Sequence, residues 1–135
     1  MKKFYIDTCI WIDLLEDRKG FNSEPLGAYA SKFFLKVFLL KMKIVFSDVV
    51  QKELFNHYSE EQIQGLLNPF INDLIIVKSS KEQKDLAHKI SIRENIPFND
   101  ALHAVLAKAS NSIFITRDKH FDKIISYFSP EKAFL

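Results

Sequence analysis

Short apolar runs alternate with longer amphipathic stretches along this chain. The runs are rich in β-branched and aromatic residues, which favour buried strands. We expect four such strands, at residues 3–7, 43–47, 73–79 and 112–116. Between them, apolar residues recur at helical spacing. Strands that alternate with helices predict βαβ units, a parallel sheet and helices on both of its faces.

Residues that cap helices mark the starts of the expected helices. Thr8 and Asn99 are candidate N-caps, and Ser59 with Gln62 has the spacing of a capping box. The helices are expected over residues 9–17, 26–42, 48–58, 60–69, 80–95 and 100–110, with a short one beginning at Asp118. The terminal residues 132–135 are expected to add an edge strand.

Composition sets limits on the class of protein. The chain has 135 residues, of which 47% are hydrophobic and 27% charged, so we expect residues 1–135 to form a single globular domain. Its single cysteine, Cys9, excludes an intramolecular disulfide and favours a reducing cytoplasm. The densest apolar run, residues 33–40, contains Lys36 and is much shorter than the roughly 20 residues that span a bilayer, so no membrane partner is expected.

Four acidic residues fall where a parallel sheet presents ligands. Asp7 ends the first strand, Asp118 follows the fourth, Asp100 opens the helix before that strand, and Glu53 lies in the helix after the second. Ligands bind outside the carboxyl ends of such strands, so these side chains are expected at one edge. Asp100 and Asp118 also have a simpler explanation, because acids near helix N-termini stabilise the helix dipole.

The charge of this acidic edge predicts a cation. Four converging carboxylates repel one another, and no lysine or arginine occupies an equivalent position at a strand end. Oxygen ligands without a cluster of His or Cys favour Mg²⁺ or Mn²⁺ over zinc. A hard cation held by acids at a sheet edge is typical of phosphoryl transfer.

Four stretches resemble the PIN-domain nucleases, especially the VapC toxins of toxin–antitoxin pairs. They are "FYIDTCIWIDLL", "VFSDVVQKEL", "IPFNDALHAVLA" and "SIFITRDKHFDKI", in that order along nearly the whole chain. The resemblance implies a three-layer α/β/α sandwich with a mainly parallel sheet. It also implies that Asp7, Glu53, Asp100 and Asp118 are catalytic and hold Mg²⁺ or Mn²⁺. Thr116 matches the hydroxyl residue that orients a carboxylate or a water.

The same resemblance implies an endoribonuclease that hydrolyses RNA, with an antitoxin protein and a second copy of the chain as partners. Arg117 and Lys119 bracket Asp118 and, with Thr116, are candidates for contacts with the substrate. Residues 29–43 carry more apolar surface than one helix face needs, which favours a role in association.

Several alternatives remain open from the sequence. Asp122 could supply the late acid in place of Asp118. The chain could be another sheet-edge Mg²⁺ enzyme, a PIN-like module that binds RNA or protein without cutting, or a processing nuclease with a housekeeping target. His103 and Trp11 are expected to be structural, and Cys9 is expected to be a small buried hydrophobe rather than a nucleophile.

Overall fold

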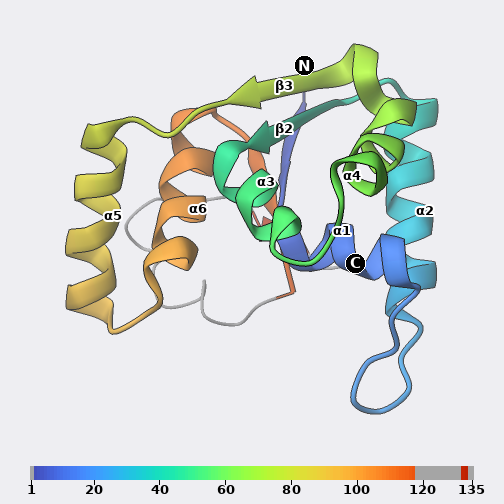
Figure 1. Ribbon diagram of the computed structural model, residues 1–135, viewed down its shortest axis with the longest axis horizontal. Coiled ribbons are helices and arrows are strands. Elements are labelled where there is room, and N and C mark those ends of the chain that lie inside the picture. Colours follow the sequence, from blue (N-terminus) through green and yellow to red (C-terminus); the bar gives the residue numbers. More distant parts are fainter. Residues whose placement is uncertain (1, 118–131, 134–135) are drawn as a thin grey trace.

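A computed structural model describes residues 2–117 and 132–133 as an α/β fold (Figure 1). The strands are β1 (Lys3–Ile6), β2 (Lys43–Ser47), β3 (Leu74–Val77), β4 (Ile113–Ile115) and β5 (Lys132–Ala133). The helices are α1 (Thr8–Glu16), α2 (Leu26–Leu39), α3 (Asp48–Phe55), α4 (Glu60–Leu67), the 3₁₀ helix η1 (Asn68–Asp73), α5 (Lys81–Glu94) and α6 (Phe98–Ala109). The predicted alternation of strands and helices is confirmed.

The strands form one sheet in the order β3-β2-β1-β4-β5, and every neighbouring pair is parallel. In β1, Tyr5 is in register with Val45 of β2 and Phe114 of β4. The first strand is therefore central, and its carboxyl end lies between those of β2 and β4. The arrangement confirms the predicted parallel α/β sheet.

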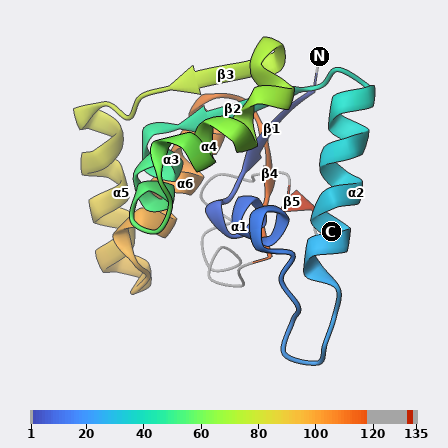
Figure 2. The same cartoon turned by 45° about the vertical axis from the view of Figure 1, so that its right-hand side comes forward.

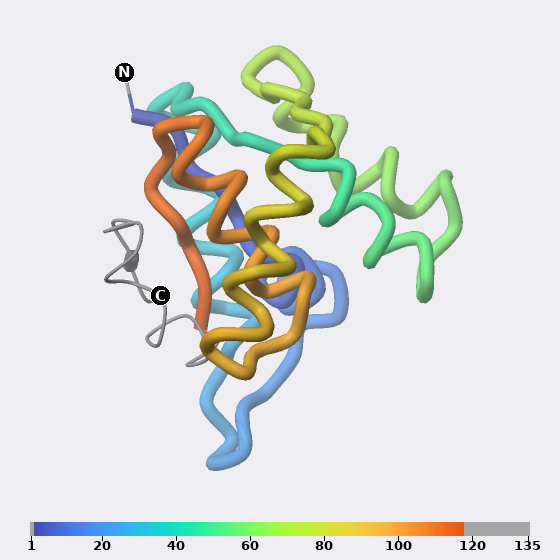
Figure 3. Tube along the Cα trace, turned by 90° about the vertical axis from the view of Figure 1, so that its left-hand side faces the viewer, coloured from blue at the N-terminus to red at the C-terminus, as the bar shows by residue number. Residues whose placement is uncertain are grey.

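Helices cover both faces of the sheet, as continuously apolar parallel strands require. In Figures 1 and 2, α2 lies on the opposite side of β1 and β4 from α5 and α6. Figure 3 shows α5 and α6 running side by side. Successive residues of β1 point to these two layers, because Phe4 packs on Phe33 of α2 while Tyr5 packs on His103 of α6.

The layer between the sheet and the first two helices is packed with aromatic rings. Trp11 of α1 is fully buried, with ring centroids 4.7 Å from Phe34 and 5.8 Å from Phe46. Phe70 of η1 closes the cluster at 5.4 Å from Phe34. The prediction that Trp11 belongs to the core is confirmed.

Two predicted N-caps are wrong, and their helices begin one and two residues earlier than expected. Asp7, and not Thr8, caps α1 through a hydrogen bond from the Thr8 backbone N–H, so the helix begins at Thr8. Helix α6 begins at Phe98 after Pro97 and has no side-chain cap, where Asn99 was expected to provide one. The capping box of Ser59 and Gln62 is present as predicted.

In the described part of the chain, no helix is both long and apolar enough to cross a membrane. The helix expected to begin at Asp118 lies outside the described residues.

Candidate active site

The carboxyl ends of β1, β2 and β4 meet at one edge, and the predicted residues follow from that geometry. Asp7 comes directly after β1, and its backbone N–H donates to the carbonyl of Ile115 at the end of β4 (2.9 Å). Thr116 comes next along that strand, and Ser47 ends β2 and caps α3. Segments far apart in sequence therefore deliver polar side chains to one place, as parallel pairing dictates.

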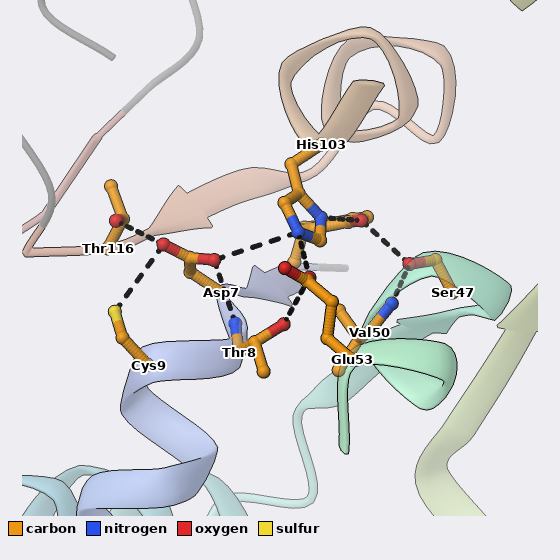
Figure 4. A network of polar contacts seen from close by, with 9 residues as sticks. Asp7, Thr8, Cys9, Ser47, Val50, Glu53, His103 and Thr116 are labelled. Carbon is orange, nitrogen blue, oxygen red and sulfur yellow. Dashed lines mark hydrogen bonds and ion pairs between the residues drawn. The ribbon is translucent and has the colours of Figure 1, made fainter. Parts of the chain in front are cut away.

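The Asp7 carboxylate is buried and held by neutral donors from two directions (Figure 4). Its Oδ1 accepts from the Thr8 backbone N–H at 2.8 Å. Its Oδ2 accepts from the Thr116 hydroxyl at 2.7 Å and from the Cys9 thiol at 3.4 Å. These contacts fix the direction of the carboxylate, and none of these donors carries a charge that offsets its own.

Glu53 reaches the same edge from within α3. Its Oε1 accepts from the Thr8 hydroxyl at 2.8 Å and from His103 Nε2 at 2.6 Å (Figure 4). A hydrogen bond from Asn99 also acts on this carboxylate. The two residues expected to be helix caps, Thr8 and Asn99, thus turn their side chains to Glu53, which explains why they do not cap.

His103 links Glu53 to the interior of the sheet. Its side chain is buried, with Nδ1 at 2.6 Å from the Tyr5 hydroxyl and Nε2 at 3.9 Å from Asp7 Oδ1. The Tyr5 hydroxyl lies 2.7 Å from Ser47 Oγ, which also accepts from the backbone of α3. A continuous chain of hydrogen bonds therefore anchors the Glu53 carboxylate to the second strand.

The pKa values of Glu53 and His103 both shift in the direction that favours the charged form of each side chain. Burial raises the pKa of Glu53, but hydrogen bonds from His103, Thr8 and Asn99 outweigh it, and the pKa is lowered overall. Burial lowers the pKa of His103, but its bond to Glu53 and the charges of Asp7, Glu53 and Asp100 raise it overall. Glu53 therefore stays a carboxylate at neutral pH.

The neighbouring thiol and phenol stay neutral. Burial and the charge of Asp7 raise the pKa of the Cys9 thiol well above its usual range. Burial also raises the pKa of the Tyr5 hydroxyl. Cys9 is half-buried and its thiol donates a hydrogen bond to Asp7, so it is not the buried hydrophobe that was expected. Its raised pKa agrees with the expectation that it is not a nucleophile.

An open pocket of about 280 Å³ lies in front of these groups. Asp7, Glu53 and Asp100 all line it, so the structure brings three of the four predicted acids to one cavity. Asp100 is in the first turn of α6, one turn before His103, where its charge contributes to the raised pKa of that imidazole. Helical spacing places these two residues on one face.

Four further residues named from the sequence do not line the described pocket or are not described. Asp118, Lys119 and the alternative acid Asp122 lie outside the described residues. Arg117 donates two hydrogen bonds, each 2.8 Å long, to the buried carboxylate of Asp13 in α1. Its guanidinium is thereby oriented by an ion pair, and its contact with substrate stays a prediction.

The donor atoms of the pocket fit a hard divalent cation, since carboxylate oxygens are its preferred ligands. The arrangement fits less well. Within residues 2–117 and 132–133, no three His, Cys, Asp or Glu side chains lie close enough together to hold one ion. A cation would therefore draw the carboxylates of the pocket closer to one another or recruit a further ligand.

Comparison with known proteins identifies the family. A family model described as the PIN domain matches residues 4–125. The chain belongs to the PIN domain family. The acids that line its pocket are those on which the resemblance in the sequence rested. No curated protein matches the chain.

Solved structures share this PIN fold. VapBC2 from Rickettsia felis, bound to a DNA fragment from its promoter, is 20% identical, with a TM-score of 0.64 over 98% of this chain and 97% of that one. A toxin–antitoxin complex from Klebsiella pneumoniae is 18% identical, with a TM-score of 0.67 over 96% and 94%. A protein from Pyrobaculum aerophilum is 11% identical, with a TM-score of 0.56 over 97% and 83%. At these identities the likeness concerns the fold.

The sequence did not indicate every residue of the site. Thr8 and Tyr5 were not singled out for it, and His103 was expected to be structural. Tyr5 lies two residues before Asp7 in an extended segment, and that spacing places them on one side of the chain. Thr8 gave no such signal, because a threonine after an acid looks like an ordinary start of a helix.

Proposed function

We propose that this chain is a metal-dependent endoribonuclease that works as a single PIN nuclease domain. The observation that carries the proposal is the convergence of Asp7, Glu53 and Asp100 on one pocket of a PIN fold. Asp118 is proposed as a fourth ligand, and Thr116, Arg117 and Lys119 as groups that position the substrate and the site.

The residues of the chain prepare the site in two ways. Asp7, Glu53 and Asp100 would hold Mg²⁺ or Mn²⁺, which when bound supplies an electrophile that activates water and offsets charge on the phosphate. Thr8, Thr116 and His103 hold the carboxylates by short hydrogen bonds, so less orientation is lost when substrate arrives.

The biological role that we propose is that of a toxin restrained by a protein antitoxin in the cytoplasm. Two of the similar structures are described as VapBC2 and a toxin–antitoxin complex, which supports such a partner here. Large apolar side chains on and after α2 give a partner a surface to cover. They are Tyr29, Leu35, Phe38, Leu39 and Leu40, which are exposed by 40–66%. A homodimer is a second proposed association.

One observation favours a second candidate, a PIN module that binds RNA without cutting it. Among the described residues, no three His, Cys, Asp or Glu side chains lie close enough together to hold a cation. This alternative predicts RNA binding that neither metal nor chelator changes into cleavage.

The test is cleavage of a mixed RNA pool by purified protein with Mn²⁺, Mg²⁺ or EDTA. Asp100→Asn removes one charge at nearly constant shape, and Asp85→Asn on the exposed face of α5 is the matched control. We expect cutting that requires metal, is lost in Asp100→Asn and is kept in Asp85→Asn. Equal cutting by all three proteins would contradict the proposed site, and RNA binding without cutting would establish the alternative.

A further inference from the structure

The pocket has a second wall that the acidic site does not explain. Besides the acids and the two residues that follow Asp7, four residues line it, and none of them carries a negative charge. They are Ile12, Arg18, Asn56 and His57. Arg18 is the one lysine or arginine among the described residues that line this pocket.

The polar residues of the second wall follow the C-terminal ends of two helices, α1, which Asp7 caps, and α3, which carries Glu53. Arg18 follows the end of α1, and Asn56 and His57 follow the end of α3. The nine residues of α1 rise by roughly 13 Å, so the backbone of Arg18 lies well beyond the acids. Its side chain nevertheless lines the same pocket as the acidic groups.

The backbone of Arg18 is fixed where α1 ends and α2 begins. Its N–H donates to the carbonyl of Asp13 (3.3 Å), and its carbonyl accepts from the N–H of Gly27 (2.8 Å). A Cβ at Gly27 would lie 2.4 Å from the Cα of Asp17, so the close approach of the two segments requires glycine.

The side chain of Arg18, in contrast, is free to take another partner. It is half-exposed, and among the described residues it pairs only with Glu16, at 3.4 Å. An exposed ion pair of this kind contributes little, so a phosphate can replace it at small cost.

The charges and groups of the pocket indicate what this wall contacts. The three carboxylates of the pocket repel an RNA backbone, and the guanidinium of Arg18 attracts a phosphate with a planar pair of donors. Asn56 and His57 are exposed beside it and offer an amide and a flat ring. Unpaired RNA bases are recognised by hydrogen bonds to such amides and by stacking on such rings.

We propose that Arg18, Asn56 and His57 form a subsite for a nucleotide that flanks the cut in single-stranded RNA. Arg18 binds the phosphate of this nucleotide, and His57 stacks on its base while Asn56 bonds to the base edge. This inference rests on the proposed nuclease function and names the substrate contacts of that same site.

The experiment measures binding of a fluorescent single-stranded RNA as a function of salt, in an Asp100→Asn background that prevents cleavage. Arg18→Ala is expected to weaken binding about tenfold and to lower the slope of log K against log salt by about 0.7, the value for one phosphate contact on a single strand. Arg18→Lys should keep the slope. Arg93→Ala, on the exposed end of α5, is the matched control and should change neither.

The base contact has its own measurement. His57→Ala should weaken binding without changing the salt slope, and His57→Phe should restore it, because a phenyl ring also stacks. In cleavage assays with residue 100 unchanged, Arg18→Ala should raise KM about tenfold and leave kcat within about twofold.

The outcomes separate this inference from the proposed function. If the wild-type protein cuts RNA and Arg18→Ala keeps the same KM and the same salt slope, the subsite is wrong and the nuclease stands. If the wild-type protein neither binds nor cuts RNA, both are wrong. An effect of Arg93→Ala equal to that of Arg18→Ala would also overturn the subsite, because it would reduce both to general electrostatic attraction.

Discussion

Two buried aspartates, Asp7 and Asp13, lie within two turns of each other but have different kinds of hydrogen-bond donors. Asp13 is 1% exposed and is paired with Arg117 through two parallel hydrogen bonds of 2.8 Å. Asp7 is 7% exposed and is held by a backbone N–H, a hydroxyl and a thiol. Among the described residues, the group that can carry positive charge and pairs with Asp7 is His103, whose Nε2 lies 3.9 Å from Asp7 Oδ1.

We infer from this difference that Asp13 is a structural carboxylate and Asp7 a functional one. A buried charge is costly unless it is paired, and the guanidinium of Arg117 donates one hydrogen bond to each carboxylate oxygen of Asp13. Neutral donors orient Asp7 without cancelling its charge, so the charge remains available at the pocket wall. The comparison predicts that changes at Asp7 affect activity, whereas changes at Asp13 affect stability.

The largest effect is expected for Asp7→Asn. Removing the charge while keeping the shape should lower RNA cleavage by about three orders of magnitude, because an electrostatic group of the site is lost. The free energy of unfolding should stay within about 1 kcal/mol of the wild-type value, since the amide oxygen can still accept from the Thr8 backbone N–H and the amide NH₂ can donate to the Thr116 hydroxyl oxygen. Cleavage rates and urea unfolding measure both, and near-normal cleavage would contradict the assignment.

Asp13→Asn should show the reverse. Breaking the pair with Arg117 leaves a guanidinium without its partner and should lower the free energy of unfolding by about 2 kcal/mol, less than for a fully buried pair because Arg117 is 37% exposed. Cleavage well below the unfolding temperature should change less than about tenfold. Urea unfolding measures the expected loss in the free energy of unfolding.

A double replacement sharpens this prediction. Asp13→Leu combined with Arg117→Met removes both charges and should recover most of the lost stability. A double variant less stable than Asp13→Asn would show that the pair does more than neutralise a buried charge.

Smaller losses are expected at His103, which acts on the site through Glu53 as a positioning residue. The amide nitrogen of glutamine takes roughly the place of Nε2, so His103→Gln should keep the bond to Glu53, while His103→Asn should lose it. We expect His103→Asn to lower Mn²⁺ affinity about tenfold or more and His103→Gln to lower it less. Calorimetric titration with Mn²⁺ compares them, and equal losses would mean that His103 acts only through packing.

The smallest effect is expected at Thr116, which donates to Asp7 Oδ2. Thr116→Val keeps the shape and removes the donor, so cleavage should fall about tenfold with a stability change near 1 kcal/mol. Thr116→Ser restores the hydroxyl and should recover activity. A valine variant as active as the serine variant would show that Thr116 does not orient Asp7.

Much of the fold was accessible from the sequence because it depends on local patterns. The apolar run ending at Asp7 predicts a strand, and the capping box of Ser59 and Gln62 predicts a helix start, both of which the structure confirms. Asp7, Glu53 and Asp100 could be placed at one edge because parallel strands present their carboxyl ends together.

The rest depends on contacts between distant residues. Thr8 and Asn99 have the local chemistry of helix caps, but Glu53, which is 45 residues from Thr8, takes their side chains. The pairing of Asp13 with Arg117 spans 104 residues. An acid in the apolar segment "CIWIDLL" signals that a partner is needed but does not identify that partner.

The most direct test of this account is titration of the protein with Mn²⁺, comparing wild type with Asp7→Asn and Asp13→Asn. We expect wild type and Asp13→Asn to bind Mn²⁺ with equal affinity and Asp7→Asn to bind it at least about tenfold more weakly. Equal affinity in all three proteins, or a loss in Asp13→Asn as large as in Asp7→Asn, would contradict the claim that Asp7 alone of the two is kept open for a cation.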